Sequence, residues 1–383
     1  MGALIKQHLI DPEICIRCHA CEEACPKGAI THNDDNVVVD AGICDGTGDC
    51  LGPCPTGAID NWRLVAEPYA LEAQFGWEEL PEEQPHAAGQ DPAPVAEAPP
   101  GSKQVAPASA ATPVINLYPP SRPVEAVVQG NYRLTAEGAE TDIRHIVLSV
   151  EGAAFPFLEG QSIGINPPGT NARGKPHVAR RYTISSPRDG ERPGAGNFSL
   201  TIRRIPGGVC SNYLCDLERG ARVKLHGPYG KTFLMPDDSQ ARLVMICTGT
   251  GAAPFRAFTM RHQRVMGDLS GRLHLFFGAR SPDALPYHGP LQKVPDSFLA
   301  KHFAFSRVPG QPRRHVQDAL REQGAKLAPM LSDANTYIYL CGLKAMEPGV
   351  EEALCDIAAS IGQDWPSLRN RMCAEGRYHV DTY

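Results

Sequence analysis

Four cysteines near the N-terminus most strongly constrain how this chain can fold. Cys15, Cys18, Cys21 and Cys25 follow the spacing C-x2-C-x2-C-x3-C, and Pro26 comes directly after the last of them. Three thiolates on one short loop can wrap around one face of a cubane iron–sulfur cluster, while the turn before the proline directs the fourth thiolate elsewhere. Zinc sites normally use paired C-x2-C knuckles, so the spacing favours iron–sulfur ligation over zinc.

The distribution of the cysteines favours metal ligation over disulfides. The chain has 13 cysteines, and seven of them fall within residues 15–54. A disulfide framework would be spread through a short secreted chain. Crowding at one end of a 383-residue chain, whose first residues are too short an apolar stretch for a signal peptide, indicates cluster binding. We therefore expect a cytoplasmic protein.

A second cysteine run repeats part of the first. Cys44, Cys50 and Cys54 form this run, and the segment PCPTGAI (53–59) echoes ACPKGAI (24–30). The pseudo-symmetry resembles two-cluster bacterial ferredoxins, in which the fourth cysteine of each run serves the other cluster. The resemblance implies a small bacterial-ferredoxin fold with two ligand sets. These sets are Cys15, Cys18, Cys21 and Cys54 for one cluster, and Cys44, Cys50 and Cys25 for the other.

Thr47 stands where the second run would need a further cysteine. A hydroxyl is a poor iron ligand beside thiolates. The second site is therefore expected to hold either a [3Fe-4S] cluster or a [4Fe-4S] cluster with one iron bound by water, hydroxide or a carboxylate such as Asp45 or Asp49. The first site is expected to hold a complete [4Fe-4S] cluster.

Length and charge limit the classes of protein to which this chain can belong. At roughly 150 residues per domain, 383 residues suggest two or three domains. The 37 Lys and Arg against 43 Asp and Glu leave a net charge of −6, which argues against nucleic-acid binding. No stretch approaches the roughly 18 apolar residues of a membrane span, so no membrane partner is expected. The sequence leaves open whether the protein forms a homodimer.

Composition separates the N-terminal region from a linker. Residues 1–66 are Cys-rich with short loops, and we expect a bacterial-type ferredoxin domain there. Residues 67–117 have the composition of a Pro/Ala-rich linker, because 11 of the 35 prolines lie between Pro81 and Pro123. The alternative is that part of this stretch packs along a domain surface.

The rest of the chain shows two hydrophobic patterns. In residues 118–237, short β-branched stretches bounded by Gly and Pro indicate an antiparallel β-barrel, with strands over 142–150, 197–205 and 221–227. In residues 238–383, strand-like and helical stretches alternate, with predicted strands over 241–249, 272–280, 303–308 and 337–342. This alternation indicates a parallel α/β domain with a nucleotide site at the carboxyl ends of its strands.

One motif in the predicted barrel suits a flavin. Arg180, Tyr182 and Thr183 lie close together on a predicted strand that continues to Ser185. An arginine can pair with a pyrophosphate, a tyrosine can lie against a flat ring, and a threonine can hydrogen-bond a ring nitrogen. An ordinary pair of strands is the alternative explanation.

Two glycine-containing turns suit phosphate groups. Gly208 and Ser211 open a predicted helix whose free backbone N–H groups would bind an anion, although an ordinary capped helix would look similar. The second turn, CTGTGAAPFR (247–256), follows a predicted strand and precedes a helix. It is not a G-x-G-x-x-G motif, but it still permits close approach of a pyrophosphate. Its expected contact residues are Thr248, Gly249, Gly251 and Pro254, the last of which stands where the third glycine would be.

Residues 118–383 resemble plant-type ferredoxin–NADP⁺ reductases. The resemblance is carried by RRYTISSP (180–187), GGVCSNYLCDL (207–217), GPYGKTFLMP (227–236), CTGTGAAPFRAF (247–258), YLCGLKAMEPG (339–349) and the terminal Tyr383. It implies FAD and NADPH as cofactors, an FAD-binding barrel over 118–237 and an NADP-binding domain over 238–383. For FAD it implies Arg180 and Ser211 at the pyrophosphate, Tyr182 and Thr183 at the isoalloxazine, and Ser185 and Gly208 in the same motifs.

The same resemblance implies residues at the site of hydride transfer. Cys341 and Gly342 would border the nicotinamide, and Thr183 would lie on the other side of the transfer path. Tyr383 would stack over the flavin until the nicotinamide displaces it. Asp381 matches a glutamate of the family but is one methylene shorter.

A third group of residues resembles the NADP-recognising segments of these reductases. It consists of Ser306, Arg307, Arg313 and Gln317, with His315 where those enzymes have tyrosine. Arginine and serine donors around a phosphate favour NADPH over NADH. A solvated basic loop is the alternative.

Nearly the whole chain resembles the reductase components of benzoyl-CoA 2,3-epoxidase. That resemblance implies electron flow from NADPH through FAD and the clusters to a separate di-iron oxygenase in aerobic benzoate breakdown. The chain itself has no site for oxygen activation, because its one Glu-x-x-His, from Glu83 to His86, contains Pro85 and cannot form the helix of a di-iron ligand pair. Alternatives are a general ferredoxin–NADP reductase, a reductase for another oxygenase, and a non-catalytic redox-sensing or docking module.

Overall fold

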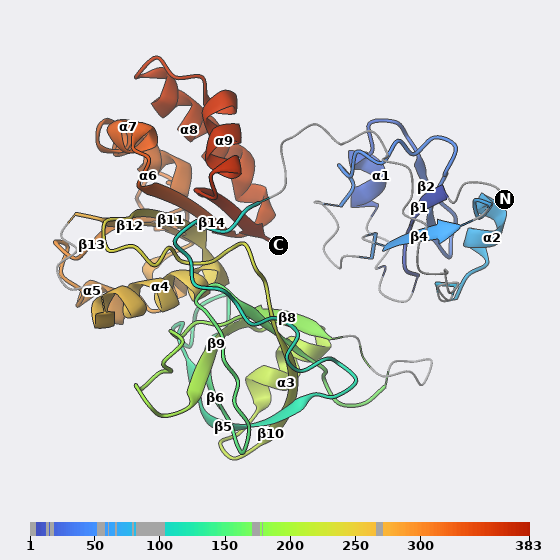
Figure 1. Ribbon diagram of the computed structural model, residues 1–383, viewed down its shortest axis with the longest axis horizontal. Coiled ribbons are helices and arrows are strands. Elements are labelled where there is room, and N and C mark those ends of the chain that lie inside the picture. The colour runs from blue at the N-terminus through green and yellow to red at the C-terminus, as the bar shows by residue number, and fades with distance from the viewer. Residues whose placement is uncertain are drawn as a thin grey trace. The chain divides into compact units, whose positions relative to one another are not determined.

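The computed structural model describes residues 5–12, 15, 19–51, 58–59, 61–65, 67–78, 80–81, 104–170, 177, 179–265 and 271–383. The chain divides into two compact units (Figure 1), which are residues 1–101 with Tyr383, and residues 102–382. Within the described part of the chain, no helix is both long enough and apolar enough to cross a bilayer.

Two small antiparallel pairs of strands build the first unit. Strand β1 (Ile5–Leu9) pairs antiparallel with β4 (Asn61–Val65), and β2 (Ile30–His32) pairs antiparallel with β3 (Val37–Val39). Two short helices accompany them, α1 (Ala20–Ala24) and α2 (Leu71–Phe75). Strands from opposite ends of the first 65 residues therefore close the unit around the cysteine-rich loops.

Cysteines form part of the core of this first unit. The buried cluster contains Cys21 and Cys50 together with Ile10, Ile30, Val37, Val39, Ala58 and Ile59. Cys15, Cys25 and Cys44 pack against it while remaining partly exposed. So few apolar side chains cannot make a large hydrophobic core. A small domain with such a core usually needs a bound metal group to be stable.

Part of the predicted linker belongs to the folded units. Helix α2 lies within residues 67–117, and its Gln74 side chain donates to the Val39 carbonyl at 3.0 Å and accepts from the Val39 N–H at 3.2 Å. Near the other end, Gln104 donates to the Val380 carbonyl at 2.7 Å. Side-chain amides thus attach both ends of the predicted linker to strand backbones, which agrees with the alternative that part of this stretch packs along a domain surface. The central residues of the predicted linker lie outside the described residues.

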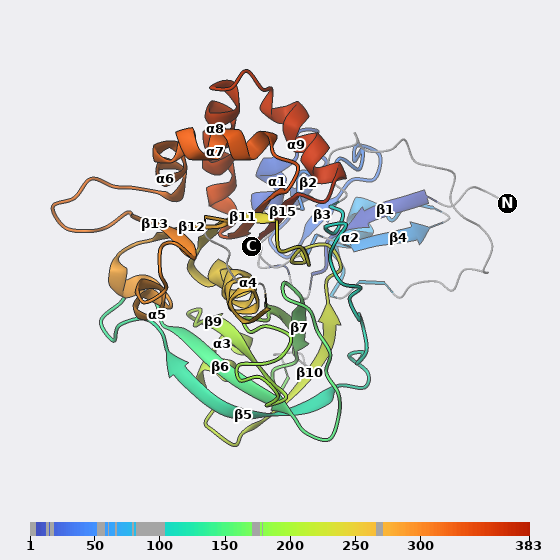
Figure 2. The ribbon, with the colours of Figure 1, turned by 60° about the vertical axis from the view of Figure 1, so that its left-hand side comes forward.

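A six-stranded antiparallel barrel begins the second unit. Its strands are β5 (Val124–Arg133), β6 (Ile143–Val150), β7 (Ser162–Ile165), β8 (Arg180–Thr183), β9 (Asn197–Arg203) and β10 (Arg222–Tyr229), in the order β8-β7-β10-β5-β6-β9. A bridge between Ile184 and Leu200 joins the two edge strands and closes the sheet. Helix α3 (Val209–Asp216) packs against β9 (Figure 2). The structure thus confirms the predicted antiparallel barrel.

A five-stranded parallel sheet follows the barrel. Its strands are β11 (Arg242–Thr248), β12 (Leu273–Ala279), β13 (Leu299–Phe305), β14 (Thr336–Gly342) and β15 (Tyr378–Thr382), in the order β13-β12-β11-β14-β15. The helical elements between them are η1 (Gly249–Gly251), α4 (Ala252–Val265), η2 (Pro282–Ala284), α5 (His288–Gln292), α6 (Val316–Glu322), α7 (Gly324–Ser332), η3 (Lys344–Met346), α8 (Glu347–Ala359) and α9 (Trp365–Ala374). The predicted parallel α/β domain is confirmed. Two details differ from the prediction. Strand β13 begins earlier than predicted because Leu299 pairs with Leu273, and β15 adds an unpredicted edge strand.

Alternate side chains of the central strand serve two separate cores. Val244 and Ile246 of β11 pack with α6, α7, α8 and α9, whereas Met245 and Cys247 pack with Phe255 and other residues of α4. Figure 1 shows these two helical layers on opposite sides of the sheet. Side chains of successive strand residues point to opposite faces, so a strand that is buried on both faces is apolar throughout.

Candidate functional site

Three of the predicted iron ligands lie together in the first unit. Burial raises the pKa of Cys50 to about 11, and the nearby Cys44 and Cys25 thiols add to this increase. Burial, with a smaller contribution from Cys25, also raises the pKa of Cys44. Three thiolates this close repel one another and can coexist only beside a cation. The donor set therefore fits an iron–sulfur cluster, in which thiolate sulfurs bind iron.

Peptide N–H groups and a histidine surround these sulfurs. The N–H of Ala29 donates to Cys25 Sγ at 3.3 Å, and Cys50 Sγ lies 4.0 Å from Nδ1 of His8. The His8 ring is buried and stacks on Trp62 with 4.1 Å between ring centroids. Hydrogen bonds to cluster sulfurs raise the reduction potential. His8 could not be predicted at this position, because no local sequence pattern shows that its ring lies beside Cys50.

The other predicted ligand set is only partly described. Cys21 is buried in the second position of α1, and the N–H of Cys15 donates to the Asp11 carbonyl at 3.0 Å. Cys18 and Cys54 lie outside the described residues. The assignment of these four cysteines to one cluster therefore stays a prediction.

Thr47 lies on an exposed turn between the cysteines of the second run. Its N–H donates to Asp45 Oδ1 at 3.3 Å, and the glycines on either side, Gly46 and Gly48, have φ of +76° and +79°. Asp45 adds to the raised pKa of Cys44, and Asp49 adds to that of Cys50. Both carboxylates that we considered as iron ligands therefore lie near the thiol group.

The flavin motif occupies strand β8 and faces the start of helix α3. Tyr182 is half-buried and donates a hydrogen bond to the Cys210 thiol, and the positive charge of Arg180 acts on that same thiol. Arg180 is exposed at the start of the strand, while Thr183 at its end pairs with Ser162 of β7. A cation, an aromatic ring and a hydroxyl thus lie within one four-residue strand, a combination that suits a pyrophosphate and a flat ring.

Ser185 is placed differently from the other residues of its motif. It is fully buried, its hydroxyl hydrogen-bonds the Ser199 hydroxyl at 2.9 Å, and its carbonyl accepts from Arg256 at 2.9 Å. The closure of the barrel through β9 produces this burial. The structure therefore buries Ser185 in the barrel, whereas Arg180 is exposed.

The turn before α3 is tightly packed. The Ser211 hydroxyl accepts from the Ile205 N–H at 3.1 Å, and a Cβ at Gly208 would lie 2.7 Å from the Ser211 oxygen. Gly207 has a φ of +74°. Backbone can approach an anion at this turn because no side chain intervenes. Gly208 and Ser211 thus lie together at the amino end of α3, the helix whose Cys210 accepts a hydrogen bond from Tyr182 of the flavin strand.

The glycine-rich turn after β11 meets the carboxyl end of β14. A Cβ at Gly251 would lie 2.1 Å from the Cys341 carbonyl oxygen, and a Cβ at Gly342 would lie 2.6 Å from Thr248 Oγ1. Thr248 Oγ1 also accepts from the N–H of Leu343 at 3.1 Å. The structure therefore brings together the residues that we predicted at the pyrophosphate and at the nicotinamide, at the sheet edge where parallel α/β domains bind nucleotides.

Two of the predicted catalytic residues, Asp381 and Tyr383, lie in or directly after the C-terminal strand β15. Asp381 pairs with Cys341 in the register of β14 and β15, and Tyr383 follows directly after this strand. The Thr382 hydroxyl donates to Glu347 at the start of α8, which holds the end of the strand in place. Burial raises the pKa of the Cys341 thiol far above its usual value.

Comparisons with known proteins agree with this arrangement. Family models match an oxidoreductase FAD-binding domain over residues 135–233, an oxidoreductase NAD-binding domain over 245–352 and a 4Fe-4S binding domain over 8–31. The ferredoxin–NADP reductase of Thermosynechococcus vestitus is 38% identical over 290 residues, which cover 70% of this chain and 75% of that protein. The chain belongs to the ferredoxin–NADP reductase family. The same name is carried by a Spirulina relative that is 36% identical over 288 residues, covering 70% of this chain and 98% of the relative.

Solved structures show the same fold. The ferredoxin–NADP⁺ reductase of Plasmodium falciparum superposes with a TM-score of 0.56 at 24% identity, and the match covers 70% of this chain and 99% of that one. The fold of the ferredoxin–NADP reductase family therefore accounts for the barrel and the parallel domain. The N-terminal match to a 4Fe-4S binding domain adds a ferredoxin-like segment to it.

A buried polar network joins the two halves of this reductase fold. Arg256 of α4 donates to Glu191 at 2.6 Å, and Nε2 of His145 on β6 lies 3.4 Å from the same carboxylate. The Tyr287 hydroxyl forms hydrogen bonds with Nδ1 of His145 at 2.9 Å and with the Thr201 hydroxyl at 2.6 Å. Burial raises the pKa of Glu191, but the hydrogen bonds and charge of Arg256 outweigh it and leave that pKa below its usual value. Arg256 belongs to the nucleotide turn in sequence, and no local pattern indicates that it pairs with Glu191.

Three of the four residues predicted at the 2′-phosphate lie between β13 and α6, and the fourth, Gln317, lies in α6. Arg307 donates to Glu140 at 3.2 Å, and Arg313 is exposed. The N–H of Ser306 donates to the Ala279 carbonyl at 3.1 Å, and a Cβ at Gly349 would lie 2.8 Å from Nε2 of Gln317. Beside Gln317, His315 forms the N-cap of α6, and its N–H donates to Asp318 at 2.8 Å. Glu140 was not predicted at this position, since nothing in its local sequence indicates proximity to β13.

Proposed function

We propose that this protein is an NADPH-dependent iron–sulfur flavoprotein reductase that supplies electrons to a separate di-iron oxygenase acting on benzoyl-CoA. One observation carries the proposal: a ferredoxin-type group of thiols, Cys25, Cys44 and Cys50, occurs in the same chain as a ferredoxin–NADP reductase module. In the relatives the reductase is named for a ferredoxin, and here a ferredoxin-like segment is part of the chain. The chain would therefore contain both the flavin site and the first electron acceptor.

FAD would be held by Arg180 and Ser211 at its pyrophosphate, and by Tyr182 and Thr183 at its ring. When bound, FAD supplies two-electron hydride chemistry on one side and single-electron transfer to iron–sulfur clusters on the other. The exposed guanidinium of Arg180 provides charge for the pyrophosphate, and the packed turn at Gly208 lets backbone N–H groups approach it. With FAD bound, Tyr182 and Thr183 would position the ring and Arg180 would hold the pyrophosphate.

Cys341 would lie beside the nicotinamide of NADPH as a neutral thiol. Because burial raises its pKa, this side chain stays protonated at neutral pH and does not act as a thiolate nucleophile. Its role would be to shape the nicotinamide subsite together with Gly342. Asp381, paired with Cys341 across the strands, and the terminal Tyr383 complete the proposed hydride-transfer group with Thr183.

Preference for NADPH would come from Ser306, Arg307, Arg313 and Gln317. Guanidinium groups form charge-assisted hydrogen bonds with a 2′-phosphate, which NADH lacks. Thr248, Gly249, Gly251 and Pro254 would accommodate the pyrophosphate at the turn after β11. The proposed set of iron ligands remains Cys15, Cys18, Cys21 and Cys54 for a [4Fe-4S] cluster, and Cys25, Cys44 and Cys50 for a second cluster of the [4Fe-4S] or [3Fe-4S] type.

The acceptor is the most specific part of the proposal. It is supported by the resemblance of nearly the whole chain to reductase components of benzoyl-CoA 2,3-epoxidase, from the cysteine runs through the linker to Tyr383. We propose the domain limits 1–66, 118–237 and 238–383 on the same basis, and a cytoplasmic location because cluster cysteines need a reducing compartment. A general reductase for ferredoxin is the second candidate, and it is supported by the names of the relatives.

The decisive experiment measures NADPH oxidation by the cluster-loaded protein mixed with a di-iron benzoyl-CoA oxygenase, with and without benzoyl-CoA. We expect NADPH consumption to rise when benzoyl-CoA is added and an oxygenated CoA ester to form in proportion. Rapid reduction of an added ferredoxin without any response to benzoyl-CoA would retain the reductase and reject this acceptor. Failure to oxidise NADPH with any acceptor would reject the reductase as well.

A further inference from the structure

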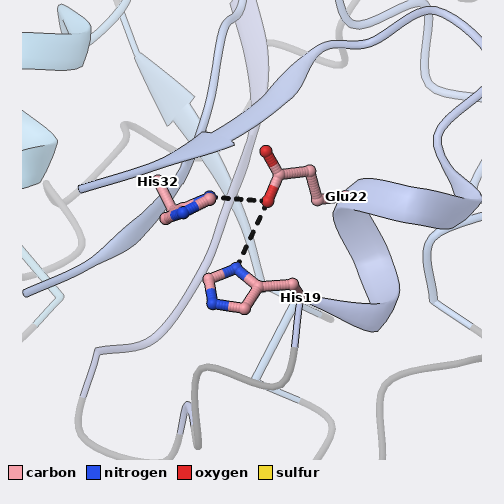
Figure 3. A group of neighbouring side chains, drawn as sticks. All are labelled: His19, Glu22 and His32. Carbon is pink, nitrogen blue, oxygen red and sulfur yellow. Dashed lines mark hydrogen bonds and ion pairs between the residues drawn. The ribbon is translucent and has the colours of Figure 1, made fainter. Parts of the chain in front are cut away.

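We propose that His19, Glu22 and His32 form a binding site for one zinc ion on the first unit. Figure 3 shows the three side chains converging, with the Glu22 carboxylate between the two imidazole rings. Nδ1 of His32 lies 2.7 Å from Glu22 Oε2, and Nδ1 of His19 lies 3.3 Å from the same oxygen. One ligand atom from each residue can be chosen so that all three lie within 4.8 Å of one another. These residues are separate from the cysteines assigned to the clusters.

The spacing of the donor atoms suits tetrahedral zinc. Zinc binds imidazole nitrogen and carboxylate oxygen at roughly 2.0–2.2 Å, so two ligand atoms on one tetrahedral ion lie about 3.3–3.5 Å apart. The distance between His19 Nδ1 and Glu22 Oε2 is already 3.3 Å, and that between His32 Nδ1 and the carboxylate, 2.7 Å, needs to lengthen by about 0.6–0.8 Å. Two imidazoles with one carboxylate are also the donor set of many open zinc sites.

Three separate local structures bring these donors together. His19 precedes α1 with a φ of +58°, Glu22 lies in the first turn of α1, and His32 ends β2. The two rings are 4.0 Å apart between centroids with an interplanar angle of 54°, and both direct Nδ1 at the carboxylate. A bound ion would link the loop of the first cysteine run to the β2–β3 hairpin.

Accessibility and charge favour a cation that keeps one open position. The side chains of His19, Glu22 and His32 are 38%, 28% and 46% exposed, so water can reach a fourth coordination position. An imidazole binds a metal in its neutral form, so two imidazole ligands and one carboxylate contribute a net charge of −1, which a divalent ion reverses. Nitrogen-rich sites of this kind bind zinc and copper more tightly than magnesium or calcium, which prefer all-oxygen donors.

The test titrates Zn²⁺ into the full-length, cluster-loaded protein by isothermal calorimetry, with visible absorption recorded to verify that the clusters stay intact. Glu22→Gln keeps the shape of the side chain and removes its charge, and His32→Ala removes one donor. Glu23→Gln is the matched control, because Glu23 is the exposed neighbour of Glu22 on α1 and is not part of the group. Loss of a residue that only hydrogen-bonds a metal ligand typically costs roughly 10–100-fold in metal affinity, so we expect loss of a ligand itself to weaken Zn²⁺ binding by at least about tenfold.

A second measurement distinguishes the site from adventitious binding. X-ray absorption at the zinc edge should show imidazole nitrogen ligands in the wild-type protein and in Glu23→Gln. Zinc should also raise the unfolding midpoint of these two proteins and leave that of His32→Ala unchanged, since an ion that binds only the folded state stabilises it. Equal zinc affinity in all four proteins, or sulfur ligands at the zinc edge, would overturn the proposal.

Discussion

Arg307 and Glu140 form an ion pair that joins the parallel domain to the barrel, with 3.2 Å between Arg307 Nη1 and Glu140 Oε1. Glu140 lies in the loop between β5 and β6, and Arg307 follows β13 by two residues. Arg280, which follows β12, also forms an ion pair with this carboxylate. The Glu140 carboxylate thus forms an ion pair with the same guanidinium group that we propose binds the 2′-phosphate of NADPH.

Glu140→Gln should improve the use of NADPH. Removing the carboxylate charge frees Arg307 for the phosphate, and exposed ion pairs are worth about 0–1 kcal/mol, so KM for NADPH should fall by up to about fivefold. KM for NADH should stay the same, because NADH has no 2′-phosphate. The measurement is steady-state reduction of a dye with each nucleotide.

Glu137→Gln, an exposed residue of the same loop, is the control for this change and should alter neither KM. Arg307→Ala tests the assignment itself. A charge-assisted hydrogen bond is worth about 1.5–3 kcal/mol, so its loss should raise KM for NADPH by roughly tenfold to a hundredfold. If Arg307→Ala affected NADPH and NADH equally, the 2′-phosphate assignment would be wrong.

Gly251→Ala should disable the nucleotide turn. The new Cβ would lie 2.1 Å from the backbone oxygen of Cys341, which cannot move aside as a flexible side chain could. Overpacking of this kind costs about 1–3 kcal/mol, and displacement of β14 should also lower the rate of NADPH oxidation. The unfolding midpoint and the NADPH oxidation rate check both effects.

Gly249→Ala provides the comparison within the same turn. Its Cβ would meet no atom within 4 Å, and the cost would be only that of a φ of +55°, about 1 kcal/mol. We therefore expect a smaller loss of stability and of activity than for Gly251→Ala. Equal effects of the two substitutions would contradict the close approach between the turn and β14.

Stability should fall in mild acid because of buried histidines. His262 of α4 is fully buried, burial lowers its pKa from 6.5 to about 4, and neither ring nitrogen has a hydrogen-bond partner in the described part of the chain. The unfolded chain then binds more protons between pH 6.5 and pH 4, so the free energy of unfolding decreases as the pH falls through this window. The slope is at most about 1.4 kcal/mol per pH unit for each such histidine.

His262→Leu should reduce this acid sensitivity. Leucine cannot bind a proton and leaves no unsatisfied polar group, so the variant should match or exceed the parent at neutral pH and lose less stability toward pH 5. Urea unfolding of both proteins at several pH values measures the difference. An unchanged slope would show that His262 is not buried as a neutral ring.

Cys25→Ser should remove the second cluster and spare the first. Cys25 belongs to the first cysteine run in sequence, but its charge acts on Cys44 and Cys50 of the second run. Iron content should fall by one cluster, and electron paramagnetic resonance of the oxidised and reduced protein should lose the signal of the second cluster while that of the first cluster persists. Loss of the first cluster's signal instead would reverse the assignment of the fourth ligand. Cys355→Ser, a change at an exposed cysteine of α8, is the control.

Local patterns were sufficient to predict much of this protein. The cysteine spacing, the turn of residues 247–256 and the alternation of strands and helices each depend on residues close together in the sequence, and periodicity identifies buried strand faces. The barrel and the parallel sheet were predicted from such patterns. Strand β15 was missed because its polar residues 379 and 381 break the apolar pattern, although pairing with β14 places it in the sheet.

The sequence by itself determined the classes of structure and the residue types at each turn, because spacing and periodicity are local properties. Only the tertiary structure decided which distant groups meet: Glu140 with Arg307, Glu191 with Arg256, and Gln74 with Val39. The burial of Ser185 likewise depends on closure of the barrel against Ser199. Such contacts arise from strand register and loop packing, and a side chain's own neighbours in sequence contain no information about either.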